Sequence, residues 1–126
     1  MPAILAKDTK KVRAVGKFLR IPADKARIMA RTVVGRPVDA AINALTFSPN
    51  KSAYLILKVL KSAVANATAN AGPDQKTVDV DSLVVSSIFV DRGPSLKRYQ
   101  PCAHGRAKPI LKRLSHITVV VEGQKA

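Results

Sequence analysis

The residues most able to do chemistry in this sequence are the cations between Asp91 and His116. That run reads DRGPSLKRYQPCAHGRAKPILKRLSH, and Asp91 is its single acid. Lysine and arginine release condensed counterions from phosphates, arginine also pairs with phosphate through two hydrogen bonds, and Tyr99 can stack on a base. The sequence therefore predicts a surface for a phosphate-rich partner, with a flexible basic linker as the alternative. The cations are Arg92, Lys97, Arg98, Arg106, Lys108, Lys112 and Arg113.

Two further side chains of this run, Cys102 and His104, offer a nucleophile and a base. No third group stands beside them to orient the base, so their geometry is unconstrained and we expect no catalysis. With His116 they supply at most three metal ligands on a loop, and we expect no metal site and no cofactor. Cys102 is the only cysteine, which excludes an intramolecular disulfide.

The composition places these cations in a chain that can fold. Its 126 residues include 22 Lys and Arg against 8 Asp and Glu, a formal net charge of +14, and 47% of them are hydrophobic. Simple disorder combines high charge with low hydrophobicity, so a core can form here. The length suits a single domain, 1–126. Because the cations spread from Lys7 to Lys125, nucleic acid is favoured over an anionic membrane surface as the partner.

The start of the chain and its apolar segments bear on the cellular location of the protein. No stretch approaches the roughly 18 apolar residues of a membrane-spanning helix, so we expect no membrane insertion. The first residues, MPAILAKDTKKVR, place a short apolar stretch before the charges, which is the reverse of a secretory signal and predicts a cytoplasmic protein. Residues 1–12 are expected to form a flexible basic lead-in, followed by a short strand at 15–21.

Apolar residues at helical spacing predict three helices. The first, 22–35, is opened by a proline and ended by a glycine, and Arg27 lies off its apolar stripe. The second spans 37–47, and the third runs from a Ser-Pro capping pair at 48 to the Gly-Pro pair at 72. Late in the third helix Asn66 and Asn70 share a face and could bind a partner. The stripes comprise Ala26, Met29, Ala30 and Val33; Val38, Ala41, Ile42 and Leu45; and Ala53, Ile56, Leu57, Leu60, Ala63, Val64 and Ala67.

Two stretches rich in β-branched residues, 83–90 and 117–121, are predicted to be strands. Two strands cannot bury both faces alone, so we expect the helices to cover the sheet on one side, which gives an α+β fold. The connection 91–116 is longer than the about 12 to 15 residues usual for an unstructured loop. We expect it to be an extended hairpin arm that prolongs the strands. Its apolar residues are too few to offset an ordering cost of about 1 to 2 kcal/mol per residue, so it should be mobile when free.

Two runs of the sequence carry a family resemblance. Residues 93–121 read GPSLKRYQPCAHGRAKPILKRLSHITVVV and residues 57–72 read LKVLKSAVANATANAG, so GP-x-x-KR, GRA, KR-x-SHITV and SA-x-AN-A occur in one chain. With these motifs the chain resembles bacterial large-subunit ribosomal protein twenty-two over roughly 18–121. The resemblance implies a small α+β body near the mouth of the nascent-chain exit tunnel, whose long β-hairpin contributes to the tunnel wall. It also implies binding to large-subunit ribosomal RNA, a part in subunit assembly and no catalytic activity.

The resemblance assigns roles to individual positions, although Cys102 and His104 replace the basic residues usual at the family's tip. The implied RNA-binding residues are Lys25, Arg27, Asn66, Asn70, Arg92, Lys97, Arg98, Arg106, Lys112, Arg113, Ser115 and His116. The implied tunnel-lining tip comprises Lys97, Arg98, Tyr99, Gln100, Pro101, Cys102, Ala103, His104 and Gly105, with 99–105 as its turn. The implied partners are large-subunit ribosomal RNA, neighbouring large-subunit proteins and the nascent polypeptide, and no homo-oligomer is expected.

A free-standing cationic architectural protein is the main alternative. Proteins of that kind usually present a recognition helix or an apolar wedge to a groove of duplex DNA. Here the cations crowd a non-helical run, and no helix is expected to show a basic stripe at a plausible reading face. The sequence therefore favours ribosomal RNA over duplex DNA.

Overall fold

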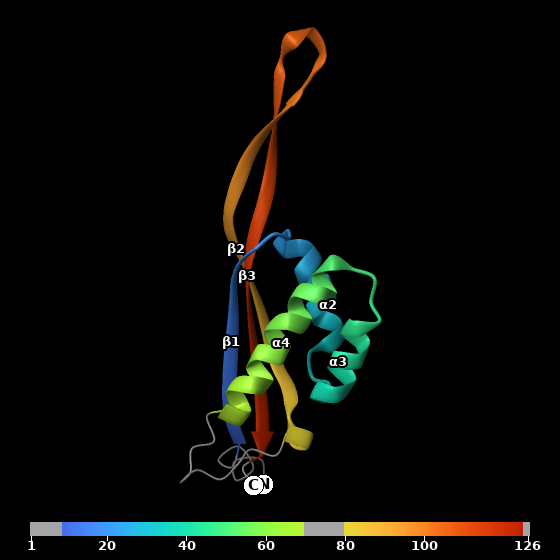
Figure 1. The fold of residues 1–126 in the computed structure, drawn as a ribbon, viewed down its shortest axis with the longest axis vertical. Coiled ribbons are helices and arrows are strands. Elements are labelled where there is room, and N and C mark those ends of the chain that lie inside the picture. The colour runs from blue at the N-terminus through green and yellow to red at the C-terminus, as the bar shows by residue number, and fades with distance from the viewer. Residues whose placement is uncertain (1–8, 70–79, 125–126) are drawn as a thin grey trace.

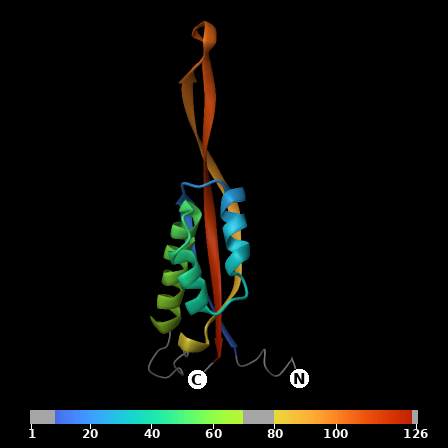
Figure 2. The same cartoon turned by 90° about the vertical axis from the view of Figure 1, so that its right-hand side faces the viewer.

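The computed structural model describes residues 9–69 and 80–124 as a helix-covered sheet from which a long hairpin extends (Figure 1). The antiparallel sheet has the strand order β1-β3-β2, and the helices lie against one of its faces (Figure 2). The predicted α+β fold with a protruding hairpin is therefore confirmed. The strands are β1 (Thr9–Leu19), β2 (Val84–Pro101) and β3 (Ala107–Gln124), and the helices are α2 (Ala23–Val33), α3 (Val38–Thr46) and α4 (Lys51–Ala69).

The core forms where the predicted helical stripes meet the sheet. Helix α4 packs on β1 and β3, α2 packs on β2 and β3, and α3 lies against α4. Leu57, Val64 and Ile42 remain half-buried at the edges of their stripes. Removal of this apolar surface from water, worth about 25 cal/mol per Å², is the main stabilising contribution to the body. The most deeply buried side chains include Val33, Leu45, Ile56, Leu60, Val85, Ile117, Val119 and Val121.

Strand β1 begins earlier than the sequence analysis expected. Val12 and Ala14 are buried in the core and pair with Val121 and Val119 of β3, whereas the adjacent Lys11 and Arg13 stay exposed. This alternation is the period of a strand with one buried face. The prediction of a flexible lead-in is therefore wrong for Thr9–Val12, and residues 1–8 lie outside the described residues.

Two predicted helix boundaries also change. Helix α4 begins at Lys51 instead of at the Ser-Pro pair. The Ser48 N–H donates backwards to the Leu45 carbonyl of α3 at 3.4 Å, so Ser48 lies in the turn that follows α3. The first helix ends at Val33 instead of at Gly35. Gly35 lies beyond it with φ +82°, a left-handed conformation that glycine adopts without strain, and its N–H donates to Val85 O at 2.8 Å. The predicted end of the third helix near 72 lies outside the described residues. None of the described helices is long and apolar enough to cross a membrane.

Candidate nucleic-acid interface

The arm, residues 91–116, is the continuation of β2 and β3 beyond the helices (Figure 1). Its strands stay paired from Asp91 opposite His116 to Pro101 opposite Ala107, with an irregularity between Arg92 and Ser95. All of residues 94–113 are described, and none of their side chains is buried. The arm is thus a two-stranded ribbon without an apolar core.

Strand alternation distributes the cations of the arm over both faces of the ribbon. Arg98 and Lys112 lie on one face, and Lys97 and Arg113 lie on the other. No cation stands directly opposite another, an arrangement that avoids the repulsion of like charges across a ladder. The opposed pairs are Lys97 and Leu111, Arg98 and Ile110, Gln100 and Lys108, Leu96 and Lys112, and Ser95 and Arg113.

The charge of the arm is not neutralised within the described part of the chain, where none of the arm cations forms an ion pair. The Arg98 guanidinium instead donates to the neighbouring Lys97 carbonyl at 2.8 Å. At the root of the arm, Arg92 and Arg113 line a hollow of about 220 Å³ beside the first turn of α2. The arm therefore presents unpaired cations from its root towards its tip.

The tip turns more tightly than predicted. Tyr99 and Pro101 are still paired within the ladder, so the expected turn at 99–105 is wrong in extent. The Cys102 N–H donates to the Arg106 carbonyl at 2.8 Å and closes a turn that contains the 3-10 segment Ala103–Gly105. His104 has φ +63°, a left-handed conformation that non-glycine residues adopt infrequently. The side chains of 99–109 are all exposed, and that of Tyr99 keeps 71% of its surface accessible.

His116 fastens the base of the arm to the body. Its Nδ1 accepts a hydrogen bond from the Phe18 N–H at 3.0 Å, and the two rings meet edge to face with centroids 4.9 Å apart. Gly93 lies against the same imidazole, since a Cβ there would lie 3.2 Å from His116 Nε2. Ser115, the neighbouring predicted RNA contact, is completely buried. The structure therefore places Ser115 in the interior instead of on an exposed face of the arm.

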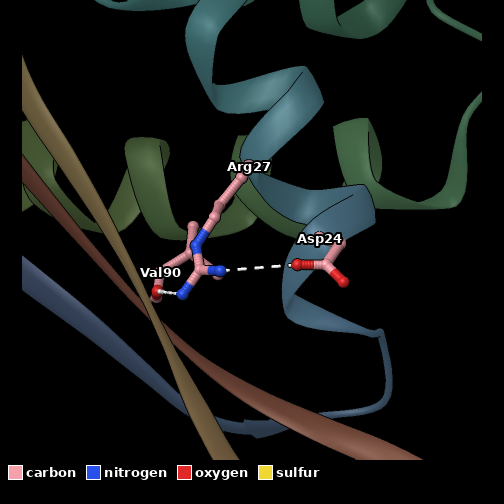
Figure 3. A network of polar contacts seen from close by, with 3 residues as sticks. All are labelled: Asp24, Arg27 and Val90. Carbon is pink, nitrogen blue, oxygen red and sulfur yellow. Dashed lines mark hydrogen bonds and ion pairs between the residues drawn. The ribbon is translucent and has the colours of Figure 1, made fainter.

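Arg27 and Asn66, both predicted to bind RNA, make contacts within the protein. Figure 3 shows the Arg27 guanidinium between α2 and β2: Nη2 donates to the Val90 carbonyl at 3.0 Å, and Nη1 lies 3.4 Å from an Asp24 carboxylate oxygen. The Asn66 amide donates to the Arg13 carbonyl at 3.3 Å and joins α4 to β1. Arg27 thus holds α2 against β2 beside the base of the arm, and Asn66 holds α4 against β1. Lys25 is exposed on α2, and Asn70 lies outside the described residues.

One cationic surface was missed by the sequence analysis. The exposed side chains Lys51, Lys58 and Lys61 follow one another along α4 at spacings of seven and three residues, which places them on one side of a helix. The expectation that no helix shows a basic stripe at a plausible reading face of duplex DNA stays a prediction, but these three lysines form a short cationic row on the solvent side of α4. The spacing was the available signal, and the apolar stripe on the opposite side of the same segment obscured it.

The two histidines considered as metal ligands do not come together in the arm. His104 lies in the tip and His116 lies at the base, and the extended strand from Ala107 to His116 alone spans about 30 Å at roughly 3.3 Å per residue. They cannot share a metal ion. Within residues 9–69 and 80–124 there is no group of three or more His, Cys, Asp or Glu side chains able to hold one.

The fold and this surface together define a class: a basic α+β protein whose cationic hairpin extends well beyond its core. Residues 14–122 match the family described as Ribosomal protein L22p/L17e. The chain is also 49% identical over 111 residues to the large ribosomal subunit protein uL22 of Desulfatibacillum aliphaticivorans, covering 88% of this chain and 97% of that protein. The chain belongs to the Ribosomal protein L22p/L17e family. It is a ribosomal protein of the large subunit, which confirms the resemblance and the cytoplasmic, large-subunit location predicted from the sequence.

Proposed function

We propose that the arm binds large-subunit ribosomal RNA, and that the chain is a structural, non-catalytic constituent that supports assembly of the subunit. In this proposal the tip, 97–105, lines the nascent-peptide exit tunnel beside the growing polypeptide. The body lies at the outer end of the arm and contacts neighbouring large-subunit proteins, and the chain forms no homo-oligomer.

The observation that carries this proposal is the combination of unpaired charge and missing core in the arm. A two-stranded hairpin is marginally stable in water, and residues 94–113 bury no side chain that would stabilise it. Cations on both faces of the ribbon suit a partner that surrounds it with phosphates, whereas a flat surface would neutralise one face only. Folded RNA offers such an enclosing surface, because its loops and grooves are lined by phosphates and 2′-hydroxyls.

We propose direct RNA contacts for some of these residues and an indirect role for others. The exposed cations of the arm, together with Lys25 on α2, are proposed to touch RNA. Arg27, Asn66 and His116 act through the framework, because each donates to or accepts from the protein's own backbone. The proposed direct contacts on the arm are Arg92, Lys97, Arg98, Arg106, Lys112 and Arg113.

Competition binding tests this function. The full chain is bound to a transcript of large-subunit ribosomal RNA and challenged with duplex DNA at the same salt concentration. We expect the RNA to be preferred, and we expect log K to fall linearly with log salt by about 0.7 to 0.9 per phosphate neutralised. Preference for duplex DNA would instead support a free-standing architectural protein, and a flat salt response would contradict binding by the cations.

Limited proteolysis tests the role of the arm separately. Free protein should be cut by trypsin first between Arg92 and Arg113, because no burial protects this segment. Protein bound to ribosomal RNA should be protected there. Equal cleavage in the two states would count against an arm stabilised by RNA.

A further inference from the structure

We propose that His116 is a positioning residue that sets the direction in which the arm leaves the body, and that it does so only while its imidazole is neutral. The ring lies against both of the strands that flank β3. The contact, called here the root contact, consists of His116, Phe18 of β1 and Gly93 of β2. It lies where the sheet changes from three strands to two, since β1 ends at Leu19 and the other two strands continue into the arm (Figure 1).

On the β1 side, the imidazole supplies an acceptor where the ladder is interrupted. The pairing of β1 with β3 is irregular between Gly16 and Leu19, where β1 carries one residue more than β3, and His116 stands opposite this bulge. Within the bulge Phe18 has φ +57°, a left-handed conformation that costs free energy in a bulky residue. The Phe18 N–H donates to His116 Nδ1 at 3.0 Å, so a side chain replaces the backbone partner that the bulge removes.

The two aromatic rings make a second contact on the same side. The Phe18 ring meets the imidazole of His116 edge to face, with centroids 4.9 Å apart and an angle of 87° between the ring planes. Phe18 is 60% exposed, so burial in the core does not hold it in its left-handed conformation. The hydrogen bond and the ring contact to His116 therefore hold this strained residue beside β3.

On the β2 side, the same imidazole occupies the space that a side chain would need. Gly93 lies in the irregularity between Arg92 and Ser95. A Cβ on Gly93 would lie 3.2 Å from His116 Nε2 and 3.2 Å from the Leu114 carbonyl oxygen, closer than ordinary van der Waals contact. The imidazole thus packs directly on the backbone of β2. Because one edge of the ring meets β1 and the other meets β2, the ring fixes the angle between the body and the arm.

The hydrogen bond to Phe18 requires a neutral imidazole. A ring nitrogen accepts only through a free lone pair, and in the protonated ring both nitrogens carry hydrogens. Acceptance at Nδ1 therefore places the single ring proton of His116 on Nε2. Histidine is the side chain whose charge ordinarily changes between about pH 5 and 8. We therefore expect the root contact to be intact at about pH 8 and to be lost as the pH falls towards about 5.

Charged groups of three elements lie around the imidazole. Asp91 of β2 stands directly opposite His116 in the ladder. From α2, Arg27 and Arg31 line a hollow together with Asp91, so these two cations approach the same carboxylate. Lys17 of β1 lies within the bulge. The carboxylate would stabilise a protonated imidazole and the three cations would oppose it, so the transition has to be measured on the full chain.

The direction of the arm matters because of the length of the arm. The strand from Ala107 to His116 spans about 30 Å, so a tilt of about 10° at the root would move the tip by about 5 Å. An arm that is already directed also loses less orientational freedom when it binds a partner. This consequence rests on the RNA binding proposed above, whereas the root contact is a property of the free protein.

Variants of the full chain test the positioning role. His116→Asn keeps an acceptor oxygen near the place of Nδ1 but does not titrate, and His116→Leu removes the acceptor. Thr118→Leu, on the same face of β3 and further into the body, is the control. Each protein carries one spin label on the native Cys102 of the tip and another on Ser62→Cys of α4, both exposed positions. Double electron–electron resonance then measures the distribution of distances between tip and body.

The expected distributions differ between the variants and between two pH values. For the unmodified chain and the control, the width should increase at least about twofold between about pH 8 and about pH 5. His116→Leu should give the broad distribution at both pH values, and His116→Asn should give the same width at both. A narrow distribution for His116→Leu would overturn the positioning role, and a width of the unmodified chain that does not change with pH would overturn the dependence on the neutral ring.

A nuclear magnetic resonance titration of the unmodified chain gives a second readout that does not depend on any variant folding. The Phe18 amide proton should shift as the pH falls, with the same midpoint as the imidazole of His116. The Gly35 amide proton is the control, because it donates to the Val85 carbonyl at 2.8 Å, which does not titrate in this range. Separate midpoints for Phe18 and His116 would refute the hydrogen bond in solution.

Binding to the large-subunit RNA transcript at about pH 8 separates this inference from the proposed function. We expect His116→Leu to bind at least about threefold more weakly than Thr118→Leu. If the unmodified chain binds no RNA while the distances respond to His116 as expected, the proposed function fails and the root contact stands. If RNA is bound but the distances respond neither to His116 nor to pH, the inference fails and the proposed function stands.

Discussion

The body and the arm are built from the same two strands, yet the strands are stabilised differently in the two regions. Within the body, Val85, Val90 and Ile117 turn into the core with 7% exposure or less. In the arm the ladder continues from the Ser95–Arg113 pair to the tip, and no side chain of 94–113 is buried. Cross-strand pairing therefore gives the arm its register, whereas burial gives the body its stability.

The difference marks the arm as the part of the described chain that burial does not stabilise. Net backbone hydrogen bonds contribute about 0.5 to 1.5 kcal/mol each, which is comparable to the about 1 to 2 kcal/mol needed to order one residue. In the body, apolar contacts add stabilisation beyond these two nearly equal free energies. In the arm, they do not. In the function proposed above, RNA phosphates supply the remaining stabilisation by neutralising the unpaired cations of the arm.

The largest effect should come from the same substitution made at two points of β3. Ile117→Ala removes a side chain that is completely buried in the body, and we expect it to lower the free energy of unfolding by about 2 to 5 kcal/mol. Ile110→Ala alters a half-buried side chain of the arm and should cost less than about 1 kcal/mol. Urea unfolding of both full-length variants measures the difference. Similar losses at the two positions would break the contrast between body and arm.

Removal of cations from the arm should have a large effect on RNA binding and a small effect on stability. Lys97→Ala with Arg98→Ala eliminates two exposed charges, so the slope of log K against log salt should decrease in magnitude by about 2. Stability should change by less than about 0.5 kcal/mol, because neither side chain is buried. Salt titrations of RNA binding and thermal unfolding of the free protein check the two halves of this prediction. A collapse of free-protein stability would show that the arm supports the body.

Much of the body was predictable because its patterns are local. The helical stripes follow from the spacing of apolar residues, and the strands at 83–90 and 117–121 follow from their β-branched residues. The first part of β1 was missed although Val12 and Ala14 alternate with cations, because the many lysines around them suggested a disordered lead-in. Burial of alternate residues decided the structure there, and charge did not.

The hairpin was predictable from the length of the connection, but its regularity was not. Pro94, Pro101 and Pro109 disfavour a regular ladder, because proline has no N–H to donate. A two-stranded ribbon nevertheless has two edges, and alternate N–H groups of each strand point to solvent. Pro94 lies within the irregularity between Arg92 and Ser95, and Pro109 pairs opposite Tyr99. Prolines at such positions cost the ladder few hydrogen bonds.

The internal roles of the predicted site residues depend on tertiary contacts that no local pattern reveals. Arg27 meets the Val90 carbonyl across 63 positions of sequence, and His116 meets the Phe18 N–H across 98. The resemblance placed both residues against RNA, since it compares positions and not contacts. The lysines of α4 differ from these two residues, because their spacing along the helix is visible in the sequence without any tertiary contact.

A smaller difference in the free energy of unfolding is expected between substitutions of two arginines of α2. Arg27→Met leaves the Val90 carbonyl without its side-chain donor, and we expect a loss of about 1 kcal/mol in the free energy of unfolding. Arg31→Met, at an exposed position one turn later, should change stability by less than about 0.5 kcal/mol. Chemical denaturation of both variants provides the comparison. Equal losses would mean that the α2 contact contributes nothing to holding β2 where the arm leaves the body.

The smallest effect should be found at Ser115, where the strand passes from the arm into the body. Its Oγ is buried and has no hydrogen-bond partner within the described part of the chain, a situation that costs about 1 to 3 kcal/mol when no water compensates it. Ser115→Ala removes the hydroxyl and should leave stability unchanged or raise it by up to about 1 kcal/mol, without an effect on RNA affinity. Ser95→Ala in the exposed arm is the control and should be neutral in both assays. A loss of RNA affinity at Ser115 alone would mean that the hydroxyl becomes exposed to the RNA on binding, and the boundary between body and arm would then have to open in the complex.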